Sequence, residues 1–194
     1  MPKLGMEPVR RTALVKATIA EIGVAGNLDV TVSKIAKRAG MSAGLAHHYF
    51  GGKEQIFLAA MRYTLTLYGQ EVRSSLAGAR GPRERLDAII RAGFADSNFQ
   101  PEAIAAWLNF YVLAQTSPEA RHLLSVYRRR LRSNLLHELR PLVGERAEAA
   151  AVRLAGMIDG LYLRQALAQT AQPSEDAVAH VLHVLDAELK ERPQ

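Results

Sequence analysis

The chain has 194 residues and a net charge of +6, and its 48% of hydrophobic residues is typical of a folded globular protein. It contains no cysteine, which excludes disulfides, thiolate zinc sites and thiol catalysis. No apolar run approaches the roughly 20 residues of a membrane span, and the N-terminus lacks the apolar core of a signal peptide. We therefore expect a cytoplasmic protein without membrane association.

The excess positive charge is concentrated at the N-terminal end of the chain. Up to Lys53 lie eight of the 25 basic and three of the 19 acidic residues, which leaves a nearly balanced 17 and 16 for the remainder. A local excess of this kind is the electrostatic footprint of a protein that binds a polyanion. The sequence thus predicts a polyanion-binding surface within the first 53 residues.

The residue pattern predicts an all-α fold. Strand-like alternation is absent, Ala, Leu, Arg and Glu dominate, and Gly or Pro residues separate segments with helical periodicity. Roughly nine helices fit this pattern. The first is expected over residues 8–24, with Leu14, Ala17 and Ile22 on its inward face.

Two short helices are predicted next, within TVSKIAKRAGMSAGLAHHYFGGKEQIF (residues 31–57). Thr31 and Ser42 are their expected N-caps, and Gly40 lies in the turn between them. Two helices joined by a tight turn predict a helix-turn-helix, whose second helix enters the major groove of DNA. The alternative is an ordinary helical hairpin, but the surrounding basic residues favour DNA binding. A long helix is expected to start at Lys53.

This segment resembles the TetR family of bacterial repressors. The matching positions are Thr31, Ile35, Ala36, Ala39, Gly40, Ser42, Gly44, Tyr49, Phe50, Lys53 and Phe57. Two positions depart from the family pattern, because Ala46 replaces a buried Leu or Ile and His47 replaces a frequent Tyr. The resemblance implies a three-helix DNA-binding domain over residues 1–53 and a helical-bundle domain for ligand binding and dimerisation over residues 54–194.

The resemblance and the side-chain chemistry together predict the DNA contacts. The residues expected at phosphates or in their positive surroundings are Thr31, Lys34, Ser42, His48, Tyr49 and Lys53. Ala43, Leu45 and His47 are the candidates for base edges, because small apolar groups suit thymine methyls and His donates or accepts at a purine. Gly44 allows close approach to the duplex or relieves helix packing. Arg10 and Arg11 reach a phosphate or the minor groove, or are merely solvated.

The family resemblance also implies a homodimer. Two-fold symmetry would place two recognition helices about 34–36 Å apart, one turn of DNA, so we expect a palindromic double-stranded operator. The implied dimer interface consists of the last two long helices, expected over residues 145–170 and 175–190. The acids Glu175 and Asp176 favour a helix start after Ser174.

Further segments, including AIAAWLNFY, YRRRLRSNLLHEL and IDGLYLR, resemble the choline-responsive TetR-type repressors of glycine betaine synthesis. This implies choline as the effector. A quaternary ammonium is bound by aromatic faces, with a carboxylate nearby for the charge. The candidate ligand-binding residues are Phe94, Trp107, Phe110, Tyr111, Tyr127, Asp159 and Tyr162. The alternative is that the aromatic residues are ordinary core and that Asp159 pairs with Arg164 or another arginine.

Three other functions remain to be weighed against a choline-responsive repressor. The first is a TetR-type repressor of another cationic or lipophilic compound, such as a regulator of drug efflux. The second is a nucleoid-type structural DNA binder. The third is an enzyme, which would need a converging catalytic set that the sequence does not display. We expect no cofactor and no metal, since His180 and His183 have helical spacing but no third ligand.

Overall fold

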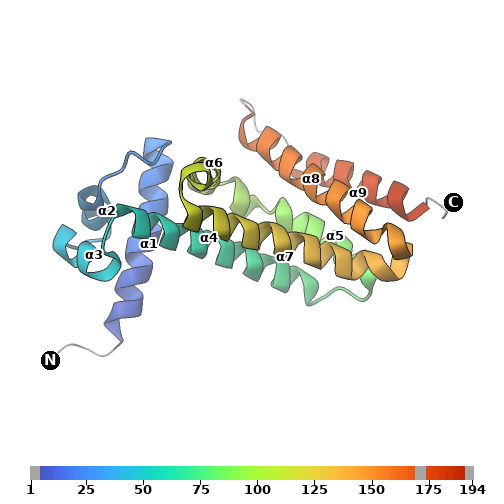
Figure 1. The fold of residues 1–194 in the computed structure, drawn as a ribbon, viewed down its shortest axis with the longest axis horizontal. Helices are drawn as coiled ribbons and strands as arrows, with labels where there is room; N and C mark the ends of the chain where they lie inside the picture. Colours follow the sequence, from blue (N-terminus) through green and yellow to red (C-terminus); the bar gives the residue numbers. More distant parts are fainter. Residues whose placement is uncertain (1–4, 169–173, 191–194) are drawn as a thin grey trace. The chain divides into compact units, whose positions relative to one another are not determined.

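The structure is a computed structural model that describes residues 5–168 and 174–190 (Figure 1). In this part of the chain all regular elements are helices, which confirms the predicted all-α class. The α-helices are α1 (Met6–Ala25), α2 (Val32–Arg38), α3 (Ala43–Phe50), α4 (Lys53–Leu76), α5 (Pro82–Gly93), α6 (Pro101–Thr116), α7 (Pro118–Val143), α8 (Ala147–Ala166) and α9 (Ser174–Lys190). Two short 3₁₀ helices are η1 (Asp96–Phe99) and η2 (Gly144–Arg146). None of the described helices is long and apolar enough to cross a membrane.

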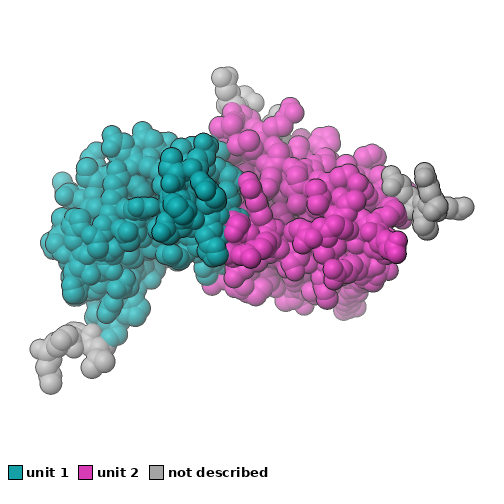
Figure 2. All heavy atoms as spheres, in the orientation of Figure 1, with its two compact units in different colours: residues 1–66, 100–124 teal, residues 67–99, 125–194 magenta. Residues whose placement is uncertain are grey.

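The chain divides into two compact units (Figure 2). The first unit comprises Met1–Thr66 and Gln100–Leu124, and therefore α1, α2, α3, α6 and the first parts of α4 and α7. The second comprises Leu67–Phe99 and Ser125–Gln194, with the remainder of α4 and α7 and with α5, α8 and α9. The functional boundary predicted at Lys53 falls within the first unit.

The predicted caps of the helix-turn-helix are confirmed. The hydroxyl of Thr31 accepts the Lys34 N–H at 3.2 Å, and that of Ser42 accepts the Leu45 N–H at 3.2 Å. Between them Gly40 has a φ of 68°, a left-handed conformation that costs glycine little. The Met41 N–H then returns to the Ala36 carbonyl at 2.9 Å, which is the bond pattern of a Schellman motif. Local sequence chemistry thus fixes the turn.

A small apolar core holds the helix-turn-helix together. Its buried residues are Leu14, Ala17, Ile22, Val30, Val32, Ile35, Ala36, Ala46, Ile56 and Phe57. They come from α1, α2, α3 and the start of α4, together with Val30 between α1 and α2, as expected for helices too short to be stable alone. Phe50 packs against this core but stays half-buried.

Helix α6 packs on α1 within the first unit, a pairing that the sequence did not predict. The crossing is tight at Gly23, where an added Cβ would lie 2.6 Å from the Glu102 Cγ and 2.9 Å from its Cα. Asn109 strengthens the crossing, because its side-chain amide donates to the Gly26 carbonyl at 3.1 Å. The α1–α6 pair therefore requires a glycine at position 23.

The second unit combines apolar packing with arginine–carboxylate pairs. On α9, Val178, Val181 and Leu185 are buried and form one apolar face of the helix. The buried carboxylates of Glu138 and Glu188 pair with arginines of other helices, Arg85 on α5 and Arg153 on α8. The expected end of the penultimate helix at Thr170 lies outside the described residues, and α8 is described as far as Ala166.

Candidate nucleic-acid interface and effector site

The predicted DNA-contacting residues share one compact unit. All twelve belong to the first unit, on α1, on α3 and at the N-terminal ends of α2 and α4, and none of them is buried. Side chains that meet DNA must be accessible, so this distribution is compatible with the predicted interface.

The start of α3 presents small side chains outward. Gly44 is exposed, and a Cβ added there would meet no atom of another part of the described chain within 4 Å. Packing within the chain therefore gives no reason for a glycine inside this helix, where it costs roughly 0.5–1 kcal/mol relative to alanine. Ala46 is fully buried, whereas its neighbour Leu45 is half-buried and keeps part of its side chain accessible.

The end of α3 carries His47, His48 and Tyr49. The His47 Nδ1 lies 3.3 Å from the Gly51 carbonyl oxygen, and the His48 and Tyr49 rings are 5.5 Å apart. A carbonyl only accepts hydrogen bonds, so the His47 contact requires a proton on Nδ1. A neutral ring then keeps an acceptor at Nε2, which matches an amino group on adenine or cytosine in the major groove.

Helix α4 begins at Lys53, as predicted. The Lys53 ammonium lies 5.5 Å from the centroid of the Phe57 ring, and free N–H groups at this helix start favour an anion. The next residue, Glu54, accepts a hydrogen bond from the Ser117 hydroxyl at 2.9 Å. Ser117 also caps α7, since its oxygen accepts the Ala120 N–H at 3.3 Å. The first turn of α4 is therefore tied to the corner between α6 and α7.

The two candidate arginines on α1 have different surroundings. Arg10 is exposed and makes no hydrogen bond or ion pair with the described residues. The Arg11 guanidinium carbon lies 5.4 Å and 5.3 Å from the ring centroids of Tyr49 and Phe50, and its Nε donates to Glu7 at 2.8 Å. Arg11 is therefore engaged within the protein, while Arg10 is not.

Three candidate ligand-binding residues lie on α6, in the first unit. Trp107 and Phe110 are buried and Tyr111 is half-buried. The Trp107 and Tyr111 rings have centroids 6.2 Å apart and are tilted by 32°. Because the two residues lie four apart on one helix, their rings approach each other.

Asp159 and Tyr127 form a pair in the second unit, where the Tyr127 hydroxyl donates to Asp159 at 2.9 Å. Burial raises the pKa of Asp159 above its usual value, although the Tyr127 hydrogen bond and the positive charge of Arg128 act in the opposite direction. The partner of Asp159 is thus a tyrosine, while Arg164 is exposed. A bound cation would stabilise the charged carboxylate.

Two aromatic residues near these candidates were not predicted. Tyr68 of α4 packs edge-on against Tyr127, with ring centroids 5.5 Å apart. The ring centroid of Phe99 lies 6.5 Å from that of Phe94 and 5.1 Å from that of Tyr162. Nothing in the local sequence marks Tyr68 or Phe99, because both reach the group through contacts between separate helices.

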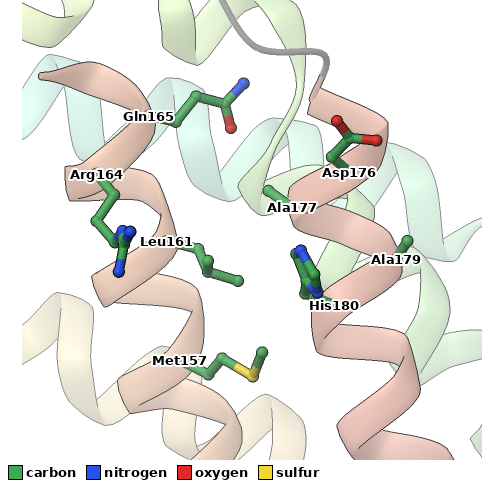
Figure 3. Close-up of a pocket in the computed structure, with 8 residues that line it drawn as sticks. All are labelled: Met157, Leu161, Arg164, Gln165, Asp176, Ala177, Ala179 and His180. Carbon is green, nitrogen blue, oxygen red and sulfur yellow. The ribbon is translucent and has the colours of Figure 1, made fainter. Parts of the chain in front are cut away.

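A groove of about 620 Å³ lies between α8 and α9 in the second unit (Figure 3). Met157 and Leu161 line one wall, and Asp176 and His180 lie on the other. His180 and His183 are both exposed, and in the described part of the chain no three His, Asp or Glu side chains gather as metal ligands.

Comparison with known families assigns both parts of the chain. Residues 14–60 match the family described as bacterial regulatory proteins, tetR family. Residues 82–190 match the family described as BetI-type transcriptional repressor, C-terminal. Together these matches cover the helix-turn-helix and most of the remaining helices, and both describe regulators of transcription.

Individual relatives agree with this assignment. The HTH-type transcriptional regulator BetI of Brucella anthropi is 50% identical over 182 residues, which cover 93% of this chain and 94% of that protein. A transcriptional regulator from Pseudomonas aeruginosa PAO1 has the same fold, with a TM-score of 0.83, 26% identity and coverage of 94% and 91% of the two chains. A regulator from Saccharomonospora viridis, solved in complex with choline, has a TM-score of 0.82, 21% identity and coverage of 94% and 98%. The chain belongs to the TetR family of transcriptional regulators, binds DNA through its helix-turn-helix, and carries the C-terminal domain of the BetI-type repressors rather than an enzyme fold.

Proposed function

We propose that this protein is a choline-responsive repressor that binds an inverted-repeat operator as a homodimer and controls genes of glycine betaine synthesis and transport. The observation that carries this proposal is 50% identity to a BetI regulator across 93% of the chain. The functional boundary is proposed at Lys53, between a DNA-binding part over residues 1–53 and a sensing and dimerising part over residues 54–194. Action on DNA places the protein in the cytoplasm.

The proposed operator contacts are centred on α3. Ala43, Leu45 and His47 read base edges, with His47 accepting from an adenine or cytosine amino group through Nε2. The absence of intramolecular neighbours around Gly44 supports close approach of the helix to the duplex. The groups proposed at phosphates or in their positive surroundings are Arg10, Thr31, Lys34, Ser42, His48, Tyr49 and Lys53.

The proposed dimer interface lies on α8 and α9. Val152 and Leu163 on α8, and Leu167 directly after this helix, have exposed fractions of 57%, 42% and 62%, which is a large apolar exposure. Their spacing of 11 and 4 residues keeps them on one face together with the exposed Gly156 and Gly160. A second copy of the chain would cover this face and the adjoining groove (Figure 3).

Choline is the proposed effector because the candidate residues match its chemistry. Its quaternary ammonium has no N–H to donate, so recognition relies on aromatic faces and on a negative charge. Asp159 supplies a half-buried carboxylate, beside Tyr127 and, through it, Tyr68. The other aromatic candidates of the second unit are Phe94 and Tyr162, and the candidates Trp107, Phe110 and Tyr111 belong to the first unit. The S. viridis regulator demonstrates that this fold accommodates choline in at least one protein.

Coupling between effector and operator is proposed to pass through the α6–α7 corner. Arg121 stiffens this corner, because its guanidinium donates to the carbonyls of Ala114 and Gln115 at 3.1 and 2.8 Å. The same corner holds Ser117, which bonds Glu54 beside Lys53. A displacement of α6 by ligand at its aromatic residues would therefore move the first turn of α4. Ligand must favour one of two states for such a displacement to change DNA affinity.

Ser117→Ala is expected to weaken the effect of choline on operator affinity about fivefold, which corresponds to roughly one lost hydrogen bond of 1 kcal/mol. Fluorescence anisotropy of labelled operator, with and without choline, measures the effect. Thr116→Ala is the matched control, since the Thr116 hydroxyl contacts only its own helix, at the Leu113 carbonyl. Glu54→Ala should reproduce the loss and leave the α7 cap in place. A Ser117→Ala protein with a full choline response would contradict this coupling route.

The proposed function is tested by footprinting DNA upstream of the protein's own gene and its neighbours. We expect protection of a symmetric site that choline weakens. Betaine aldehyde and hydrophobic cations serve as parallel additions. Release by a hydrophobic cation and not by choline would replace choline with another effector class, and uniform protection without a preferred site would identify a structural DNA binder.

A further inference from the structure

We propose that Arg11 is a positioning residue for operator binding, which acts by bracing the last turn of α3 rather than by contacting DNA. This inference rests on the proposed function, because it concerns how well α3 presents its side chains to an operator. It separates Arg11 from Arg10, its neighbour on α1, although both arginines are equally suited to a phosphate by charge.

The geometry around Arg11 is that of a cation packed on two aromatic rings. Its guanidinium carbon lies 5.4 Å from the Tyr49 ring centroid and 5.3 Å from that of Phe50, within the range of a cation–π contact. Its Nε is simultaneously directed at the Glu7 carboxylate, 2.8 Å away on the preceding turn of α1. Glu7 thus holds the guanidinium over the rings and partly neutralises it.

The last turn of α3 has few other contacts that would stabilise it. The helix has only eight residues, and a helix of two turns is marginal without tertiary contacts. Its single buried residue is Ala46, whose methyl group contributes little apolar area. The remaining anchors are Tyr49 and Phe50, which are half-buried against the core. Arg11 covers these two rings from α1.

The salt dependence of operator affinity distinguishes a bracing role of Arg11 from a phosphate contact. Each phosphate neutralised by a protein cation adds about 0.9 to the slope of log affinity against log salt. If Arg11 acts through Tyr49 and Phe50, its removal lowers operator affinity and leaves that slope unchanged. If it contacts a phosphate, the slope falls together with the affinity.

The experiment compares Arg11→Ala with Arg10→Ala, which removes the same charge one residue away. In the free protein, amide hydrogen exchange at Gly51 reports the last turn of α3, because this N–H bonds the His47 carbonyl at 2.7 Å. We expect about fivefold faster exchange in Arg11→Ala and a rate within twofold of wild type in Arg10→Ala. Arg11→Lys, which keeps a cation near the rings, should restore slow exchange.

Operator titrations at several salt concentrations complete the test. We expect Arg11→Ala to bind the operator about fivefold more weakly with a wild-type salt slope. The same substitution made in Tyr49→Ala should cost less than fivefold, because Arg11 then packs on Phe50 alone. Wild-type operator affinity in Arg11→Ala, a slope lowered by about 0.9, or additive losses in the double variant would each overturn the inference.

The exchange measurement keeps this inference separate from the proposed function. If the wild-type protein recognises no inverted repeat, the proposed function fails, whereas the exchange rate at Gly51 still decides whether Arg11 braces α3. Unchanged exchange in Arg11→Ala would overturn the inference even if the protein binds its operator as proposed.

Discussion

A palindromic operator is expected to bind this protein at least 100-fold more tightly than a single half-site of the same sequence. In a dimer, the first recognition helix to bind holds the second close to its own half-site, and such linkage raises overall affinity by about 10²–10⁴ without any new type of contact. Fluorescence anisotropy with both DNAs measures the ratio. The salt concentration must be the same in both titrations, because phosphate contacts make affinity strongly dependent on salt.

Two controls connect this advantage to the proposed dimer face. Leu163→Glu places a charge on the exposed apolar face of α8 and should reduce palindrome affinity to that of a half-site. Val112→Glu makes the same type of change at an exposed apolar residue of α6, outside that face, and should bind like wild type. Inserting half a helical turn of DNA between the half-sites should also remove the advantage. Equal wild-type affinity for palindrome and half-site would rule out the dimer.

The helix-turn-helix was predictable because short-range chemistry determines it. Thr31 and Ser42 accept N–H groups three residues further on, and Gly40 supplies the left-handed residue between the helices. These contacts join residues that are close together in the sequence, so a single sequence is enough to infer them. The apolar spacing of Val32, Ile35 and the following residues then orients α2 toward the core.

Contacts between segments that are far apart in the sequence could not be predicted from local sequence patterns. Gly23 reads as part of a helix end, yet in the structure it permits the close crossing with Glu102 on α6. Likewise, the bond between Ser117 and Glu54 joins residues 63 positions apart. These pairs depend on how helices pack, and no local periodicity specifies a partner helix.

The candidate effector-binding residues were also predictable only where they are close together in the sequence. Spacing placed Trp107 and Tyr111 on one face of a helix, and their rings do approach each other. The hydroxyl partner of Asp159 was not predicted, since Tyr127 lies 32 residues away and the partners considered were a bound cation or, as the alternative, an arginine. Within the described residues the carboxylate accepts a hydrogen bond and feels the positive charge of Arg128, but it forms no ion pair, which leaves it suited to a cation that brings no hydrogen-bond donor of its own.

Asp159→Asn is accordingly expected to weaken choline binding about 100-fold, or roughly 2.7 kcal/mol, because it removes the charge and keeps an oxygen that can accept from Tyr127. Trp107→Ala should also weaken binding, by about tenfold, if its ring faces the ammonium. Calorimetric titration measures both. Asp176→Asn, at an exposed carboxylate on the α8–α9 groove, is the matched control and should bind choline like wild type.

The pH dependence of choline affinity gives the same prediction a second readout. Burial raises the pKa of Asp159, so acid converts this carboxylate to its neutral form at a higher pH than for an ordinary aspartate. Choline favours the charged form, and its binding therefore lowers that pKa and releases a proton near and below it. Affinity should rise with pH up to the raised pKa of Asp159 and level off above it, whereas Asp159→Asn should show no such rise. Unchanged choline affinity in both Asp159→Asn and Trp107→Ala would show that choline does not bind at these residues. Weaker choline binding by Asp176→Asn would instead indicate a choline site in the groove between α8 and α9.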